Sequence, residues 1–176
     1  MTLRLRYYPD SILKRVALPI EKMNEEVLEL AQAMVQVMHR NEGVGLAAPQ
    51  VGIDKRLLVY DASCVNPEAH PRALINPIVT EISGGLEWGD EGCLSFPGVW
   101  GSVRRPRQIH LLAQSLSGEP VDEKITGFEA RIILHELDHL DGILFVDRLR
   151  WWRRYLALRK YQKPEEGAEP AEGPAL

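Results

Sequence analysis

The segment HELDH, residues 135–139, holds the side chains whose spacing most directly suggests chemistry. His135 and His139 are four residues apart, and Glu136 follows the first histidine. On an α-helix, residues four apart share a face, so both imidazoles could bind one metal ion. Neutral imidazole nitrogens suit zinc or divalent iron. Glu136 would lie about 100° further round the helix, beside the metal, where a carboxylate can act as a general base toward water.

The alternative for this segment is a buried helix that carries two histidines by chance. The run from 128 to 142 is otherwise largely apolar, and imidazoles and carboxylates are costly to bury without partners. Metal binding is therefore the favoured interpretation. Asp138 and Asp141 are open to two readings: each could orient a histidine from behind the metal or simply make local pairs.

A third ligand has to come from elsewhere in the chain. The metzincin pattern needs a histidine where Phe145 stands, and a downstream glutamate ligand would be Glu165 or Glu166, in a segment whose composition predicts no rigid structure. Cys93, in the glycine-flanked stretch DEGCLSFPG, remains. A thiolate is a strong metal ligand, although a lone cysteine is often only a small buried apolar residue. Three protein ligands leave a position for water, which is typical of a catalytic site.

The glycine-rich segment EGVGLAAPQVG, residues 42–52, is too irregular for a helix or a long strand. It lacks the Lys-Ser/Thr ending of a P-loop and the spacing of a dinucleotide-binding loop. Glycines would let its backbone pair with an extended peptide. Gln50 is either a turn residue or an amide donor that polarises a carbonyl group.

Composition predicts one globular domain. The chain has 176 residues, 45% of them hydrophobic, and a net charge of −4, so neither a membrane nor a specific DNA partner is expected. Two cysteines, Cys64 and Cys93, and no signal peptide favour a reduced, cytoplasmic protein over a disulfide-linked one. We expect a single catalytic domain over 1–162 and a flexible Pro/Glu/Gly/Ala-rich tail over 163–176.

The hydrophobic pattern predicts an α+β fold with mainly antiparallel sheets packed around a central metal-binding helix, together with an N-terminal and a C-terminal helix. The first helix should begin after Asn24, and the central one should end at Gly142. The third helix, 148–162, is basic and aromatic; we expect its aromatic side chains to pack on the body and its cations to face solvent. Extended segments are expected at 56–61, 73–82 with an interruption at Pro77, 98–116 with a break near Pro106, and 119–126.

Three segments together resemble the motifs of the peptide deformylases, in that family's order: GVGLAAPQ at 43–50, EGCLS at 91–95 and HELDH at 135–139. One departure is Leu134, where the family usually has glutamine. The resemblance implies a metallohydrolase that removes the formyl group from N-formylmethionyl peptides and releases formate. It also implies Fe2+ as the metal, with Zn2+, Ni2+ or Co2+ able to occupy the site.

The resemblance also implies roles for individual residues. The metal ligands would be Cys93, His135 and His139, with Glu136 as the acid/base residue. Gln50 and the backbone N–H of Leu94 would form the oxyanion hole, and backbone groups of Val44, Gly45 and Gly92 would hold the peptide as an added strand. Phe128 and Ile132, with Val44, could line a methionine pocket, although core packing explains them equally well. The basic helix 148–162 would dock on the anionic RNA surface of the ribosome.

Two other classes of protein stay open at this point. One is a zinc peptidase that cuts internal bonds, against which the missing downstream ligand argues. The other is a structural metal domain that binds RNA or ribosomes through its basic helix. The open coordination position beside Glu136 favours the hydrolase over both.

Overall fold

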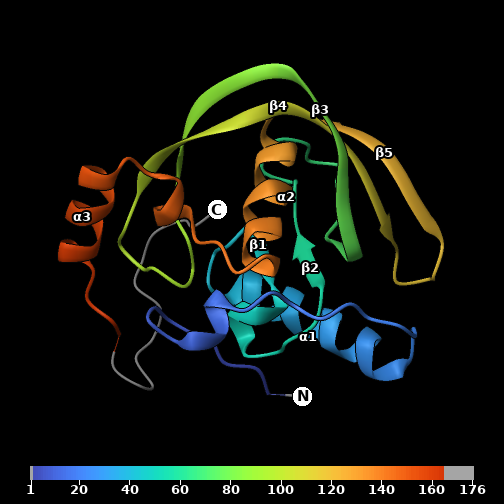
Figure 1. Ribbon diagram of the computed structural model, residues 1–176. Coiled ribbons are helices and arrows are strands. Elements are labelled where there is room, and N and C mark those ends of the chain that lie inside the picture. The colour runs from blue at the N-terminus through green and yellow to red at the C-terminus, as the bar shows by residue number, and fades with distance from the viewer. Residues whose placement is uncertain (1, 165–176) are drawn as a thin grey trace.

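The computed structural model describes residues 2–164, which form the expected α+β fold (Figure 1). Five strands make one antiparallel sheet in the order β1-β2-β3-β4-β5. Their bounds are Gly45–Ala47 for β1, Leu57–Tyr60 for β2, Arg72–Glu91 for β3, Gly101–Gln114 for β4 and Pro120–Thr126 for β5. The helices are α1 over Glu25–Arg40, α2 over Gly127–Leu140 and α3 over Trp151–Lys160. Of the expected tail 163–176, residues 165–176 lie outside the described residues.

Helix α1 begins where the sequence indicates. The Asn24 side chain accepts a hydrogen bond from the backbone N–H of Val27 at 3.1 Å, which satisfies one of the free amides of the first turn. Apolar residues at helical spacing then face the interior, among them the fully buried Met34 and Met38. They form a core cluster with β1 and β2, so α1 covers one side of that part of the sheet.

Helix α2 is the central helix of the molecule, and the long strands β3 and β4 arch over it in Figure 1. Ile132, Ile133 and Leu140 have no exposed surface and pack with residues of β2, β4 and β5. The helix ends before Gly142, whose φ of 71° suits glycine because it has no Cβ. This packing fixes the axis of α2, and with it the polar side chains on its remaining face.

The strands differ from the sequence prediction at two prolines. The break near Pro106 is wrong, because β4 runs through this position without ending. Pro77 does interrupt the pairing of β3 with β4, but β3 itself continues past it. The reason is irregular pairing: the β3–β4 register shifts between Ile75 and Ile78 and again between Ser83 and Leu86, whose partner is Pro106. A bulge lets a strand accommodate a residue that cannot donate to the ladder.

Helix α3 also departs from expectation. Two of the aromatic side chains expected to pack on the body do not, since Trp151 is 82% exposed and Tyr155 57% exposed. Tyr161, just beyond the helix, does pack there, with its ring centre 5.2 Å from that of Phe96. Ala157 is the one buried residue of α3, whose whole length lies in the described range. The helix starts three residues later than Arg148, because 145–148 form a separate 3-10 turn that directs α3 along the side of the body (Figure 1). So short a helix turns only a narrow face inward.

None of the helices within residues 2–164 combines the length and the apolar character needed to cross a membrane.

Candidate active site

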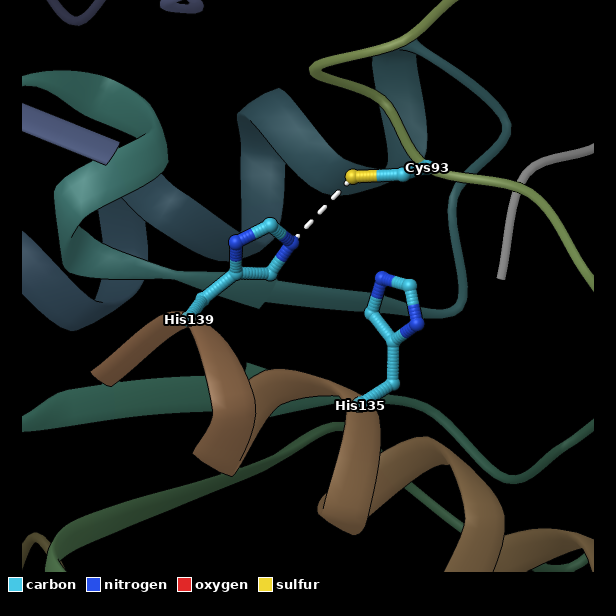
Figure 2. A group of neighbouring side chains, drawn as sticks. All are labelled: Cys93, His135 and His139. Atoms are coloured by element: carbon cyan, nitrogen blue, oxygen red, sulfur yellow. Dashed lines mark hydrogen bonds between the residues drawn. The ribbon is translucent and has the colours of Figure 1, made fainter. Parts of the chain in front are cut away.

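The structure brings three predicted ligands together, and we refer to Cys93, His135 and His139 as the metal centre. Cys93 lies just beyond the end of β3, whereas the two histidines project from α2 toward it (Figure 2). The Cys93 Sγ is 3.1 Å from His139 Nε2, and one donor atom from each residue lies within 4.8 Å of the others. All three side chains are buried.

The donor atoms fit a single divalent cation. The Nε2 of His135 is buried without a hydrogen-bond partner among the described residues, which is costly unless something else satisfies it. Burial lowers the pKa of the His139 imidazole, which favours its neutral, metal-binding form. One thiolate and two imidazoles are a donor set that suits Zn2+ or Fe2+. A metal ion bound by the metal centre would therefore satisfy His135 Nε2, which has no other partner among the described residues.

Glu91 stands behind the metal centre and orients one ligand. Its Oε2 lies 3.0 Å from His135 Nδ1, which favours a proton on Nδ1 and leaves Nε2 free for a metal. Arg105 donates to both carboxylate oxygens at 2.9 Å, and Arg131 donates to Oε1 at 3.0 Å. Burial alone would raise the pKa of Glu91, but the Arg105 guanidinium and the His135 ring outweigh it and hold that pKa well below its usual range.

The two aspartates of the helix motif make pairs with arginines and do not orient a histidine. Asp138 accepts hydrogen bonds from Arg105 at 2.6 Å and from Arg148 at 3.0 and 2.5 Å. Asp141 accepts one from Arg56 at 2.7 Å. Asp138 thus continues the charged chain that starts at His135 and passes through Glu91 and Arg105. We call this row of side chains, from His135 to Arg148, the ionic chain.

Sequence reasoning missed Glu91, Arg105 and Arg131. Glu91 stands inside the EGCLS motif, which was a usable signal for a role near Cys93. The arginines gave none: only the fold reveals that Arg105 and Arg131 are buried, whereas the neighbouring Arg104 and Arg107 are exposed.

Glu136 lies on α2 with its carboxylate turned toward β1. The side chain is fully buried, and neither oxygen has a hydrogen-bond partner among residues 2–164. Burial raises the pKa of Glu136 to about 7. The carboxylate fits because residue 45 is glycine: a Cβ on Gly45 would lie 2.9 Å from the Glu136 carboxyl carbon. A buried, unpartnered carboxylate beside a metal centre is well suited to exchange protons with a bound molecule.

Gln50 and Leu94 lie next to Cys93. The Gln50 Oε1 accepts a hydrogen bond from the Ala47 N–H at 2.7 Å, which holds the amide group in place. Its Nε2 lies 3.5 Å from Cys93 Sγ and 3.4 Å from Ser95 Oγ. The backbone N–H of Leu94 makes no hydrogen bond to another backbone group in the described part of the chain. Two donors with weak or absent partners therefore flank the metal centre.

The segment expected to hold a peptide forms the edge of the sheet. Strand β1 stands at one end of the strand order, and Gly45 pairs with Tyr60 on its inner side. The carbonyl of Val44 accepts from the Asp61 N–H at 2.9 Å. Gly92 precedes Cys93, close to the Trp100 ring. An edge strand offers free backbone groups to an extended chain.

The expected pocket residues lie on the first turns of α2. Phe128 is 36% exposed, whereas Ile132 has no exposed surface and belongs to the core cluster of α2 and the sheet. Leu134, which replaces the family's usual glutamine, is half-buried and packs against the same cluster. It therefore adds apolar contacts where the family usually has an amide.

Comparison with known proteins gives consistent results. The family model described as polypeptide deformylase matches residues 2–155. Peptide deformylase 2 of Gloeobacter violaceus is 46% identical over 140 residues, which cover 80% of this chain and 75% of that protein. The peptide deformylase of Maricaulis maris is 39% identical over 92% of each chain.

Solved structures agree in fold. A peptide deformylase from Synechococcus elongatus, in complex with actinonin, superposes with a TM-score of 0.85 at 40% identity, covering 90% of this chain and 86% of that one. One from Legionella pneumophila gives a TM-score of 0.84 at 36% identity, with coverage of 91% and 93%.

Proposed function

The chain belongs to the polypeptide deformylase family, so it is a metal-dependent hydrolase that removes the N-formyl group from the amino-terminal methionine of newly made proteins, and we propose that Glu136, Gln50 and Leu94 perform the chemistry. The observation that carries this assignment is the buried carboxylate of Glu136, unpartnered among the described residues, beside the metal centre. Neither a peptidase for internal bonds nor a purely structural metal domain accounts for the family match.

The metal centre would hold one divalent ion through the Cys93 sulfur and one nitrogen each of His135 and His139. When bound, the ion supplies a Lewis acid that polarises the formyl carbonyl and makes a water molecule more acidic. We assign Fe2+ as the native ion, with Zn2+, Ni2+ and Co2+ as alternatives, on the family resemblance; the donor set alone suits several ions. Metal analysis of protein purified without oxygen should find iron, and stoichiometric zinc in that preparation would contradict the assignment.

Glu136 moves the proton. Its carboxylate takes a proton from the water that attacks the formyl carbon and then delivers it to the amine that leaves with the peptide. Gln50 Nε2 and the Leu94 N–H donate hydrogen bonds to the formyl oxygen as negative charge develops on it. Formate and a peptide with a free amino terminus result, so every atom of the amide and the water is accounted for.

The substrate would lie along β1. Backbone groups of Val44, Gly45 and Gly92 would pair with the first residues of the peptide as an added strand, which the edge position of β1 supports. Phe128 and Ile132, with Val44, would line the methionine pocket. The partly exposed ring of Phe128 supports its part in this; for Ile132 the support is only its place one turn further along α2.

Formate release tests the proposal directly. The purified protein, incubated with formyl-Met-Ala-Ser, should release formate, and an unformylated peptide should stay intact. Chelation should abolish the release, and adding back the metal should restore it. Formate release that Glu136→Ala leaves unchanged would overturn the assignment of Glu136.

We further assign residues 1–162 to a single catalytic domain, with 163–176 as a separate Pro/Glu/Gly/Ala-rich tail. Support comes from α3 and Tyr161, since the Tyr161 hydroxyl donates to the Tyr8 carbonyl at 2.9 Å and joins the end of that range to the beginning of the chain. We place the protein in the cytoplasm, where new chains emerge; Cys64 and Cys93 are free thiols, as a reducing compartment would keep them.

The basic segment 148–162 would associate with the ribosome. Its exposed cations support this, because the surface of ribosomal RNA is anionic. Charge reversal at Arg153 and Arg154 should weaken co-sedimentation with ribosomes at low salt while formate release from a short peptide persists. Unchanged co-sedimentation would dismiss this role.

A further inference from the structure

A basic and aromatic groove lies on the opposite side of β3 and β4 from Glu91. Two tryptophans, one serine and three arginines line it, and its volume is about 440 Å³; the residues are Trp88, Ser102, Arg148, Arg150, Trp152 and Arg153. Trp88 lies near the end of β3 and Ser102 near the start of β4, on neighbouring rungs of the ladder, since Trp88 pairs with Arg104 and Ser102 with Asp90. The other residues come from the turn before α3 and from its first residues. We call it the β–α3 groove. Its size is within the range of small-ligand sites.

The positive charge in this groove is only partly used within the described residues. Arg148 is held in place by Asp138, to which it donates two hydrogen bonds. Arg150 and Arg153 are exposed and make no ion pair with any residue from 2 to 164. The Arg153 guanidinium lies over the Trp152 ring, 5.1 Å from its centre. Because the whole chain carries −4, this cationic patch is a local feature and not a result of composition.

The indoles in the groove are also unused by the fold. Trp88 is 59% exposed on β3 and Trp152 is 41% exposed on α3. Two large aromatic faces beside free guanidinium groups resemble neither a core nor an ordinary solvated surface. An acidic peptide would pair with the arginines but leave the indoles exposed. Duplex RNA would offer phosphates, yet its bases are stacked inside and cannot reach an indole.

We propose that the β–α3 groove binds unpaired nucleotides of an RNA strand. Phosphates pair with Arg150 and Arg153, a base stacks on Trp152 or Trp88, and the Ser102 hydroxyl hydrogen-bonds to the ribose or the base edge. This inference rests on the proposed ribosome association and deepens it: a single-stranded loop with exposed bases is the contact, and the backbone of a duplex is not.

Binding of labelled RNA to the full chain tests the inference. A single-stranded oligomer of about eight nucleotides should bind at low salt more tightly than a hairpin duplex of equal charge or a polyglutamate peptide. Trp152→Ala should raise the Kd about tenfold, because stacking on an aromatic ring is worth about 1–3 kcal/mol per base. Trp152→Phe should restore most of the affinity. The matched control is Trp151→Ala, which removes a neighbouring indole that lies outside the groove.

The charges have their own matched pair. Replacing both Arg150 and Arg153 by glutamine should reduce the slope of log Kd against log salt concentration by about 1.4, because each lost phosphate contact with a single strand lowers the slope by about 0.7. The same change at Arg159 and Lys160, which carry equal charge at the other end of α3, should affect the slope less. Equal losses from both pairs, or from Trp151→Ala and Trp152→Ala, would overturn the inference.

Two further outcomes would also overturn it: duplex RNA or polyglutamate bound as tightly as the single strand. Formate release from formyl-Met-Ala-Ser, measured on the same samples, separates this result from the fate of the proposed chemistry. RNA binding without formate release would support the groove and contradict the catalytic assignment. Formate release without RNA binding would overturn the groove alone.

Discussion

The metal centre and helix α3 both gather charged and aromatic side chains, but their surroundings differ. Around the metal centre, Glu91 and Arg105 are buried and paired on every side. On α3, Arg153 and Trp152 face solvent. Electrostatic attraction is several times stronger away from water, and a group left unpaired there has no solvent to satisfy it. Neighbours, more than residue type, therefore decide what a substitution costs in each of these two regions.

The largest effect is expected at Glu136. Glu136→Ala should lower kcat for formyl-Met-Ala-Ser by about 10³–10⁴, near the upper end of what general acid–base catalysis contributes. Glu129→Ala is the control, since Glu129 lies on the same helix and bonds to Tyr60. Formate release is the measurement, and metal content should stay equal in both variants. A similarly large loss of kcat for Glu129→Ala would mean that the effect is not specific to Glu136.

Gln50→Ala should lower kcat by about 10²–10³, the usual effect of removing one oxyanion donor. Gln50→Glu separates chemistry from stability, because it keeps the oxygen that accepts from the Ala47 N–H but removes the donor. Both variants should be slow, and only the alanine variant should lose stability in a thermal melt. Full activity in Gln50→Glu would contradict the donor role.

Gly45→Ala should lower kcat about 100-fold, because the new Cβ would lie 2.9 Å from the Glu136 carboxyl carbon and displace the carboxylate by about 1 Å. Gly43→Ala is the matched control: its Cβ would meet the end of the Leu94 side chain at 2.8 Å, and a leucine methyl can rotate away. Its loss should stay below about tenfold. Equal losses in steady-state kinetics would mean that backbone flexibility, not the position of Glu136, matters here.

Arg105→Met tests the buried ionic chain against an exposed pair. Leaving Glu91 and Asp138 without this partner should cost about 3–5 kcal/mol of unfolding free energy and weaken metal binding about 10–100-fold. Arg72→Met breaks a two-bond pair with Glu123 at the surface and should cost less than about 1 kcal/mol. Urea titration and competition with a metal-binding dye measure the two quantities. Similar losses of unfolding free energy in the two variants would contradict the expected difference between the buried ionic chain and the exposed pair.

The smallest effect is expected on α3. Trp151 is 82% exposed, so Trp151→Ala should change the unfolding free energy by less than about 0.5 kcal/mol and leave formate release unaltered. Thermal melts at matched protein concentration measure it. A clear destabilisation would mean that α3 contributes to the fold in a way that its contacts do not reveal.

The parts of the site that could be predicted are those with local causes. The spacing of His135 and His139 follows from helix periodicity. The Asn24 side chain caps α1 by accepting a hydrogen bond from Val27, only three residues later in the sequence. Both are visible in a short window. Cys93 required a comparison of alternatives, since 42 residues separate it from the first histidine.

What could not be predicted depends on long-range contacts. Arg105 reaches Asp138 across 33 residues, and no pattern in the sequence distinguishes it from its exposed neighbours. Pro106 lies within a strand because a register shift in the partner strand accommodates it. The aromatic residues of α3 read as core residues by type, yet the turn before the helix directs Trp151 and Tyr155 outward.

Strand β1 spans only Gly45–Ala47. So brief an edge can read no more than the opening few positions of a visiting chain, and mainly through peptide groups that all sequences share. Such an enzyme would depend little on the side chains that follow the first residues of its substrate. The shortness of β1 would thus allow one enzyme to act on many different new proteins.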